Sequence, residues 1–491
     1  MMLSFDPDKV SVPTGNYIDG QSCQTRGETL AIKRPSDGQV YAELNEAQAG
    51  DVDRAVQVAH RAARESGWAT CSPRERGRVL RRWASLIEQD AHQLGQLEAL
   101  GSTRPIADVI NHEIPFTAEA IRFYAECADK YSGDLFPTQS SSLGMLLTEP
   151  FGVIGAITPW NFPLSMASWK CGPALAAGNA VVLKPSELTP FSTVRMAELA
   201  VQAGLPAGIL NIVQGRGEVA GSALVRHPLV RKVSFTGSTQ TGAQIMSDAA
   251  QFGMKPVTLE LGGKSPQVVF DDAGDIDELA ARILRGFTAN GGQACVAGTR
   301  LIVQRGIADA LTEKLIALCR TFRPGLTWDE NTRYAPMIDA RQGNKVAAVV
   351  AAAKAAGAEV LVGGERFADT GDGWFWQPTL LTGMAADNPA IQTEIFGPVL
   401  TIQRFDEEEE ALRMAAHDTY GLCAGVHTLN LPRALRAVRQ LAAGTVWVNR
   451  YGRSGDFIIP TGGFLGSGIG KDLGRQAFQA CQQQKSVLID F

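Results

Sequence analysis

Cys295 is the side chain whose type and surroundings best suit covalent chemistry. It lies in the segment Asn290-Gly-Gly-Gln-Ala-Cys295-Val-Ala-Gly-Thr-Arg300, after a helix-like run and before a strand-like one. Small neighbours leave the sulfur approachable, and backbone N–H groups in such a turn can lower a thiol pKa and hold an oxyanion. Most cysteines are inert, however, so this segment alone favours a buried structural cysteine.

Glu260 is the candidate general base. It ends an apolar run, Val257-Thr-Leu-Glu260, and is followed by Leu261 and two glycines. A carboxylate at the end of an apolar strand is poorly placed as a solvated surface charge, and it could activate water. The alternative is a structural glutamate that forms an ion pair, for example with Lys264.

Asn161 is the candidate donor to developing negative charge. It lies in Thr158-Pro-Trp-Asn161-Phe-Pro163, directly after a strand-like run. Two prolines and two aromatic residues stiffen this loop, which could hold the Asn161 amide against an oxyanion. The alternative is a packed turn in which Asn161 caps the following helix.

Two glycine-containing turns could receive phosphate. In Phe235-Thr-Gly237-Ser-Thr-Gln-Thr-Gly242 a strand leads into a helix, whose N-terminus offers free N–H groups. This turn is not a Walker P-loop, because Ala243-Gln244 stand where that motif needs Lys-Ser/Thr. The second turn is Gly215-Arg-Gly217-Glu-Val-Ala-Gly221, whose glycine spacing is only close to that of the dinucleotide fingerprint. Each turn alone indicates nucleotide binding weakly.

Composition narrows the class of protein. The chain has 491 residues, 45% of them apolar, and a formal net charge of −5, which predicts about two to four domains and no nucleic-acid or membrane partner. Eight cysteines without a CxxC pair and six histidines without metal-ligand spacing predict reduced thiols and no metal site. We see no secretory signal and no spanning segment, because the apolar stretch 345–362 reads as an amphipathic helix. These features predict a cytoplasmic protein.

The elements that must position these residues alternate along the chain. Strands are predicted at 152–158, 180–183, 209–213 and 232–235. Helices alternate with them: one ends near 179, and three more are predicted at 192–204, 219–227 and 239–250. A second set of strands is predicted at 266–270, 300–303, 399–405 and 445–449, with helices at 276–289 and 307–320. This rhythm is typical of parallel sheets covered by helices, in two α/β domains. The last run, 485–491, reads as a strand without a local partner, which would pair with a sheet edge of the same chain or of a neighbouring subunit.

In combination these segments resemble the aldehyde dehydrogenase superfamily over nearly the whole chain. The resemblance rests on nine blocks in order: TPWNFP (158–163), LKPSE (183–187), FTGST (235–239), LELGGKSP (259–266), GGQACVAGTR (291–300), EIFGPVL (394–400), TYGLCAGV (419–426), GTVWVN (444–449) and SGIGKDLG (467–474). It implies oxidation of an aldehyde to the acid with NAD(P) through a thioester. It also implies a Rossmann-like cofactor domain (1–131 and 151–262), a catalytic α/β domain (263–466) and a small β oligomerisation arm (132–150 and 476–491), in a homodimer or homotetramer.

The resemblance assigns roles to matching positions. Cys295 would be the nucleophile and Glu260 the base; Asn161 and the Cys295 N–H would form the oxyanion hole, and Lys170 would relay protons from Glu260. Lys184 and Glu187 would hold the adenosine ribose, Ser238 the pyrophosphate and Glu394 the nicotinamide ribose, with Phe396 packing nearby. The remaining cofactor residues would be Trp160, Gly217, Phe235, Gly237, Gly242, Leu261 and Gly262, and the substrate pocket would include Phe162, Met166, Trp169, Ala294 and Val296.

Some positions depart from the family pattern. Leu465 stands where many members have lysine, Lys471-Asp472 replaces Arg-Glu, and His417-Asp418 replaces Ala-Asn. The second change predicts a shorter or weaker proton relay from Glu260. Arg450 or Arg453 would favour aldehydes with a carboxylate or other polar tail, unless an arginine merely pairs with Asp456 and shapes the loop.

Three alternatives compete with hydrolytic aldehyde oxidation. Glu260 disfavours a coenzyme-A-acylating enzyme, which has no need of a base that activates water. The lack of a Cys–His motif disfavours a cysteine hydrolase, and the joint presence of Cys295, Glu260 and Asn161 disfavours a non-catalytic descendant. Glu187 predicts NAD over NADP, because it would repel a 2′-phosphate, although Lys184 weakens that argument.

Overall fold

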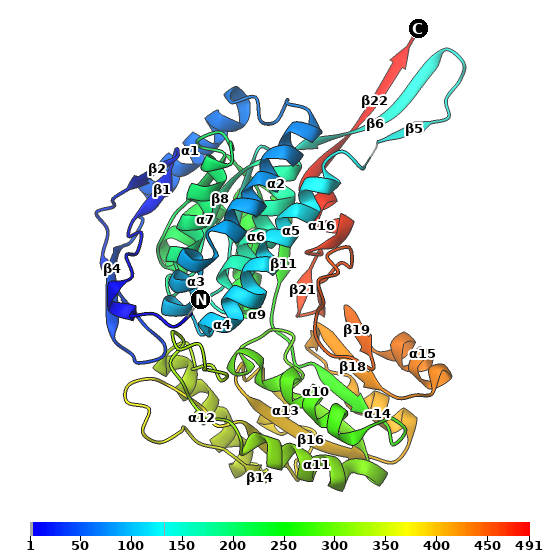
Figure 1. Ribbon diagram of the computed structural model, residues 1–491. Helices are drawn as coiled ribbons and strands as arrows, with labels where there is room; N and C mark the ends of the chain where they lie inside the picture. The colour runs from blue at the N-terminus through cyan, green and yellow to red at the C-terminus, as the bar shows by residue number, and fades with distance from the viewer. Residues whose placement is uncertain (1–2, 132) are drawn as a thin grey trace.

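Two β-sheets covered by helices organise the computed structural model, which describes residues 3–131 and 133–491 (Figure 1). Both sheets are largely parallel, so the predicted α/β class is confirmed. Residues 1, 2 and 132, which the sequence assigns to the first domain and to the arm, lie outside the described residues. No helix within the described part of the chain is long and apolar enough to cross a membrane.

The first sheet has the strand order β2-β1-β9-β8-β7-β10-β11-β21. Its bounds are β1 Asn16–Ile18, β2 Gln21–Cys23, β7 Val153–Ile157, β8 Ala180–Lys184, β9 Leu210–Ile212, β10 Val230–Thr236, β11 Val257–Glu260 and β21 Gly468–Ile469. The five central strands are parallel, whereas β1 and β21 pair antiparallel with β9 and β11. The chain therefore winds from β7 through β8 to β9 and then crosses back to β10 and β11. In such a sheet the point of reversal, here between β7 and β10, leaves a crevice beyond the carboxyl ends of the strands.

Helices cover this sheet because its central strands are almost wholly buried. They are α1 Ala49–Glu65, α2 Pro73–Gln89, α3 Ala91–Gly101, α4 Ile106–Asp108, α5 Ile114–Cys127, α6 Pro163–Ala176, α7 Phe191–Gln202, α8 Ser222–Arg226, α9 Thr239–Gln251 and α16 Gly474–Ala480. Helix α2 packs on α5, α6 and α7, whereas α1 packs on α8, which also contacts α9. A separate hairpin, β3 Thr29–Lys33 with β4 Val40–Asn45, lies at the side of this unit (Figure 1).

The second sheet has the order β14-β15-β16-β13-β12-β18-β19. Its bounds are β12 Pro266–Val269, β13 Arg300–Gln304, β14 Glu359–Val362, β15 Thr379–Thr382, β16 Val399–Phe405, β18 Cys423–His427 and β19 Thr445–Val448. Its helices are α10 Ile276–Thr288, α11 Arg305–Cys319, α12 Ala340–Ala355, α13 Pro389–Gln392, α14 Glu408–Ala415 and α15 Leu431–Gln440. All of its pairs are parallel except β14 with β15. Two short strands, β17 Tyr420–Gly421 and β20 Phe464–Leu465, pair beside it.

A third sheet forms an arm that extends from the body and carries the C-terminus at its tip (Figure 1). It has the order β22-β6-β5, with β5 Asp134–Phe136, β6 Ser142–Pro150 and β22 Gln482–Asp490. Strand β22 runs antiparallel to β6, from Gln482 opposite Pro150 to Asp490 opposite Ser142. The C-terminal strand thus begins three residues before the predicted position 485, and its partner lies in the same chain.

Two predicted helices are wrong in extent. The stretch 345–362 is not one helix: α12 ends at Ala355, Gly357 has a φ of +93°, and β14 follows. A left-handed residue after the last turn is a common helix stop, and glycine adopts it without strain. The stretch 219–227 divides into a π-helical turn, Gly217–Gly221, and the short helix α8.

Candidate active site

A cavity of about 570 Å³ opens where the carboxyl ends of the first sheet face the second sheet. Its walls come from the loops after β7, β10 and β11, from the turn after α10, and from the loop after β19. The loops after β7 and β10 flank the point at which the strand order reverses. This is the place where open α/β sheets bind ligands.

Cys295 reaches this cavity from a tight turn after α10. A short 3₁₀ turn, Ala289–Gly292, follows the helix, and Asn290, Gly291 and Gly292 all have φ between +52° and +72°. A Cβ on Gly292 would lie 2.3 Å from the backbone of Gly397, so only glycine fits. This run of left-handed residues reverses the chain and presents Cys295 half-buried on the cavity wall.

Hydrogen bonds from Gln293 fix this turn. Its side-chain amide donates to the carbonyl oxygens of Asn290 and Pro336, each at 2.9 Å, and its side-chain oxygen accepts from the Ile338 N–H. The residue two positions before the thiol is therefore bound on three sides. Cys295 is thus held by a rigid backbone rather than by a mobile loop.

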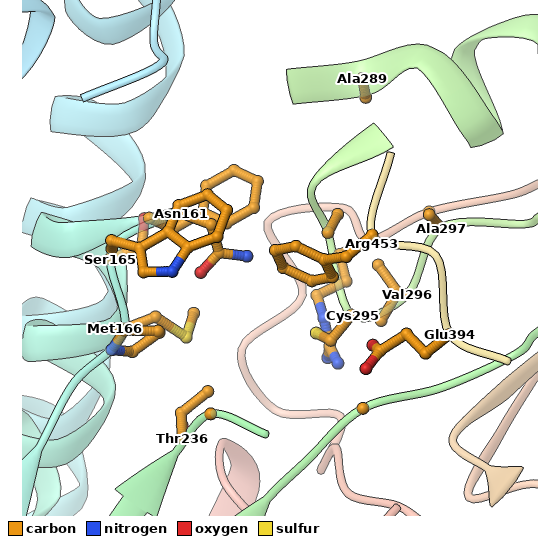
Figure 2. A pocket seen from close by; sticks show the side chains of 18 of the residues that line it. Asn161, Ser165, Met166, Thr236, Ala289, Cys295, Val296, Ala297, Glu394 and Arg453 are labelled. Carbon is orange, nitrogen blue, oxygen red and sulfur yellow. The ribbon is translucent and has the colours of Figure 1, made fainter. Parts of the chain in front are cut away.

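Asn161 is bound to the same turn from across the cavity. Its Nδ2 donates to the Gln293 carbonyl at 2.9 Å, and its own carbonyl accepts from Asn290 Nδ2 at 3.0 Å. The second hydrogen of the Asn161 amide remains for another acceptor. Asn161 does not cap the following helix, since α6 begins after Phe162 without a side-chain cap. Figure 2 shows Asn161 on one wall of the cavity and Cys295 on the opposite wall.

Glu260 lies at the end of β11, beneath the cavity wall, and is 5% exposed. Its Oε1 accepts from the Asp472 N–H at 3.4 Å. Burial and the nearby carboxylate of Asp472 raise the pKa of Glu260, whereas Arg453 and Lys170 oppose that rise. A raised pKa allows a carboxyl group to exchange protons near neutral pH. The alternative of an ion pair with Lys264 is wrong, because the Lys264 ammonium is buried without a hydrogen-bond partner among the described residues.

Lys170 lies next to Asp472 rather than Glu260. Its buried Nζ is 3.2 Å from Asp472 Oδ2 and donates to Ser234 Oγ at the same distance. Asp472 therefore contacts both groups, Glu260 through its backbone N–H and Lys170 through its carboxylate. The aspartate that departs from the family pattern still reaches the lysine.

Seven of the predicted cofactor residues line the cavity, namely Trp160, Gly237, Ser238, Leu261, Gly262, Glu394 and Phe396. Ser238 caps α9, accepting from the Thr241 N–H at 3.2 Å. Glu394 accepts from the Gly263 N–H at 3.1 Å, and burial raises the pKa of this carboxyl. A Cβ on Gly262 would lie 2.3 Å from Glu394, so the glycine lets this carboxylate approach the backbone.

The other five predicted cofactor residues lie outside the residues that line this cavity. Lys184 ends β8 and pairs with Glu187 at 3.2 Å, and its Nζ also donates to the Gly215 carbonyl at 2.7 Å. Gly217 borders open space, because a Cβ there would meet nothing within 4 Å. Phe235 and Gly242 pack under the turn instead: a Cβ on Gly237 would lie 2.4 Å from the Phe235 ring, and a Cβ on Gly242 would lie 2.5 Å from Leu261.

The predicted substrate residues Phe162, Met166, Trp169, Ala294 and Val296 all line the cavity, together with Phe116. The rings of Phe116 and Trp169 lie 6.2 Å apart. Most of this wall is therefore apolar and aromatic.

The structure separates the two candidate arginines. Arg453 lines the cavity, whereas Arg450 is exposed and donates to the Gly452 carbonyl at 3.3 Å. Neither forms an ion pair with Asp456, which accepts instead from the Ser454 hydroxyl. The alternative of an arginine paired with Asp456 is therefore wrong for the described residues.

Sequence reasoning missed several polar residues of the cavity, among them Gln342 and Lys345 on α12. Gln342 donates to the Phe396 carbonyl at 2.9 Å and so lies beside the predicted cofactor residues. Nothing local marks these residues, because α12 reads as an ordinary amphipathic helix.

Comparison with known proteins agrees with this geometry. Residues 22–487 match the Aldehyde dehydrogenase family. An aldehyde dehydrogenase of Aspergillus niger is 42% identical over 480 residues, which are 98% of this chain and 95% of the relative.

Solved structures give the same result. The chain superposes with a TM-score of 0.96 on an indole-3-acetaldehyde dehydrogenase mutant of P. syringae in complex with NAD+ and IAA, at 39% identity over 99% of this chain and 98% of that one. It superposes with a TM-score of 0.95 on gamma-glutamyl-gamma-aminobutyraldehyde dehydrogenase from Burkholderia cenocepacia, at 41% identity over 99% and 98% of the two chains.

Proposed function

Because the chain belongs to the aldehyde dehydrogenase family, we propose that it oxidises an aldehyde to the carboxylic acid, with NAD as the oxidant and a thioester on Cys295 as the intermediate. One observation carries this proposal. The thiol of Cys295 and a free amide hydrogen of Asn161 line one cavity, and the buried carboxyl of Glu260, whose pKa is raised, lies directly before the lining residue Leu261 and close enough to raise the pKa of Cys295. The water that is consumed supplies the second oxygen of the acid.

The first step is attack by the thiolate of Cys295 on the aldehyde carbon. The carbonyl oxygen becomes an alkoxide, and the Asn161 amide and the Cys295 N–H are the donors proposed to hold it. Both groups are preorganised, because Asn161 and the turn before Cys295 are bound to each other through Gln293 and Asn290. Stabilisation by fixed donors needs little rearrangement when the charge develops.

NAD fits the residues at and beside the cavity. The N-terminus of α9 at Ser238 can receive the pyrophosphate, Glu187 can accept from a ribose hydroxyl, and Glu394 from the second ribose. The open space beside Gly217 leaves room along this face. Bound there, NAD would supply the acceptor for the hydride that must leave the carbon attached to Cys295 if the adduct is to become a thioester.

Hydrolysis of the thioester falls to Glu260. Its carboxylate removes a proton from water, which attacks the acyl carbon and releases the acid and the thiol. We propose that Asp472 and Lys170 then take up the proton, since the carboxylate of Asp472 lies close enough to raise the pKa of Glu260 and pairs with Lys170.

The proposal extends to the parts of the chain that surround the site. Residues 1–131 and 151–262 would form the cofactor domain and 263–466 the catalytic domain, with the first and second sheets at their centres. Residues 132–150 and 476–491 would form the oligomerisation arm of a homodimer or homotetramer. Exposed apolar side chains on the arm, namely Leu135, Phe136, Leu147, Leu488, Ile489 and Phe491, support this assignment.

A panel of aldehydes tests the proposal. The purified protein should form NADH and acid in equal amounts, without coenzyme A, and kcat/KM should rank aliphatic and aromatic aldehydes by their fit to the apolar wall. Activity that requires coenzyme A and yields acyl-coenzyme A would favour the acylating alternative. Hydrolysis without NAD would favour a cysteine hydrolase, and inactivity with every aldehyde would favour a non-catalytic role.

A further inference from the structure

Arg453 is a cation at the cavity that has no carboxylate partner among the described residues. It lies on the loop between β19 and β20 and is half-buried. Its guanidinium stacks over the Trp169 ring at 5.1 Å and donates to the Thr461 hydroxyl. An arginine held in place by an aromatic face and a neutral acceptor keeps its full charge available for other groups.

Arg453 acts on the two groups that the proposed reaction needs in their deprotonated forms, Cys295 and Glu260. Burial raises the pKa of the Cys295 thiol to about 11, and the charge of Arg453 is the largest influence against that rise. The Val296 N–H also lowers this pKa, whereas Glu260 and Glu394 raise it. Burial and then Asp472 raise the pKa of Glu260, and Arg453 is again the largest opposing influence, ahead of Lys170.

The geometry agrees with this electrostatic pattern. Arg453 and Cys295 both line the cavity (Figure 2), and the Arg453 guanidinium reaches across it to the Trp169 ring of α6. The Thr461 that holds Arg453 also exchanges two backbone hydrogen bonds with Asp472, at 2.8 and 2.9 Å. Asp472 in turn contacts Glu260 through its N–H. The guanidinium is therefore tied through one residue to the segment that contacts the base.

We infer that Arg453 is the cation that favours the thiolate of Cys295 and the carboxylate of Glu260 over their neutral forms. The inference rests on the proposed function for its purpose, because both charged forms serve thioester chemistry. The pKa of Cys295 is about 11 with Arg453 in place, so loss of this charge would raise it further and make the thiolate rarer still at neutral pH. An adjacent opposite charge typically lowers such a pKa by about one to three units.

The competing role for Arg453 is recognition of a carboxylate on the substrate tail. A guanidinium is equally suited to that task. The two roles differ in one respect: stabilisation of the thiolate requires no substrate, whereas tail recognition does.

The test is the rate of alkylation of Cys295 by iodoacetamide across pH, without NAD or aldehyde. Peptide mass spectrometry follows Cys295, with the half-buried Cys71 as the internal reference. Arg453→Met should move the midpoint of the Cys295 profile to higher pH and slow alkylation at neutral pH about tenfold or more. Arg453→Lys should restore most of the rate, and Thr461→Val, which removes only the acceptor hydroxyl, should have an intermediate effect. A change of access alone would alter the plateau at high pH and leave the midpoint in place.

Arg450→Met is the matched control, because this arginine lies on the same loop and outside the cavity. It should leave the profile of Cys295 unchanged. The inference is overturned if Arg453→Met keeps the wild-type midpoint, with thermal unfolding showing that the variant is folded. A variant that changes only the ratio of kcat/KM for carboxylate-tailed and neutral aldehydes would assign Arg453 to the substrate instead. Failure of the proposed function is a separate result, since it would appear as a wild-type protein that forms no NADH.

Discussion

Glu260→Gln should separate acylation from hydrolysis. The substitution keeps the side-chain volume and retains an oxygen that can accept from the Asp472 N–H. That hydrogen bond is long, at 3.4 Å, and the same N–H also donates to the Thr461 carbonyl at 2.9 Å. The substitution should therefore lower the stability of the folded protein only a little. The loss is chemical, because a positioned base is typically worth about 10²–10⁴-fold in the step it serves. This corresponds to roughly 3–5 kcal/mol in the barrier to hydrolysis.

Rapid mixing of Glu260→Gln with NAD and aldehyde should give a burst of NADH close to one equivalent per active site, followed by slow turnover. Intact mass after acid quench should show the acyl group on the protein. Glu98→Gln is the matched control, because Glu98 is also a buried glutamate, 1% exposed, whose pKa burial raises to about 8, and unlike Glu260 it is not among the main charges that act on Cys295. It should show wild-type kinetics. In the wild-type protein, the rate of turnover limited by hydrolysis should rise with pH as Glu260 loses its proton. This rise should occur at a higher pH than the titration of an ordinary glutamate, because the pKa of Glu260 is raised.

The reasoning is refuted if Glu260→Gln turns over at the wild-type rate, since Glu260 is then not the base. If it shows neither burst nor adduct while binding NAD normally, its main role is to deprotonate Cys295. That outcome would also strengthen the coupling of these two groups through Arg453.

Three further results are expected. Cys295→Ala should abolish NADH formation and still bind NAD by fluorescence titration, and residual turnover above background would exclude the thioester route. The wild-type protein should have a higher kcat/KM with NAD than with NADP. Glu187→Gln should reduce this ratio of kcat/KM values about tenfold, because it removes a like charge beside the 2′-phosphate of NADP. Equal or better activity of the wild type with NADP would contradict the expected preference. Removal of residues 485–491 unpairs β6 from Leu147 to Ser142 and should give a smaller or aggregating species on size-exclusion chromatography. An unchanged elution volume with unchanged melting temperature would show that the arm assignment is wrong.

Local pattern was sufficient for the elements that hold the nucleophile and base. Val257–Glu260 is the apolar strand that the sequence predicts, and Cys295 lies between α10 and β13, within one or two residues of the predicted bounds. Short apolar runs that end at glycines define buried parallel strands, and the carboxyl ends of such strands converge. The fold and the meeting of Cys295, Asn161 and Glu260 were therefore within reach of the sequence.

Pairings between distant segments were not within reach of local pattern, and only the family resemblance indicated the relay and the arm. Lys170 and Asp472 lie 302 positions apart, and neither sequence neighbourhood predicts the other. The pairing of β22 with β6 and the position of Arg453 in the cavity depend on the same long-range packing. The prediction of one helix over 345–362 was wrong for another reason. A short strand after an alanine-rich helix has the same apolar pattern as one more helical turn.

The segment after the second sheet explains why these distant groups meet. Its strand β21 returns to the first sheet and pairs antiparallel with the end of β11, with Gly468 opposite Glu260. A Cβ on Gly468 would lie 2.3 Å from the Leu259 carbonyl, so glycine permits this contact. The pairing places Asp472, four residues later, between Glu260 and Lys170, and its backbone bonds to Thr461 fix the loop that carries Arg453. One returning segment therefore sets the protonation of the base from two directions, with a carboxylate that raises its pKa and an arginine that lowers it. A change that disturbs β21 should then alter the pH dependence of hydrolysis without touching any residue of the cavity.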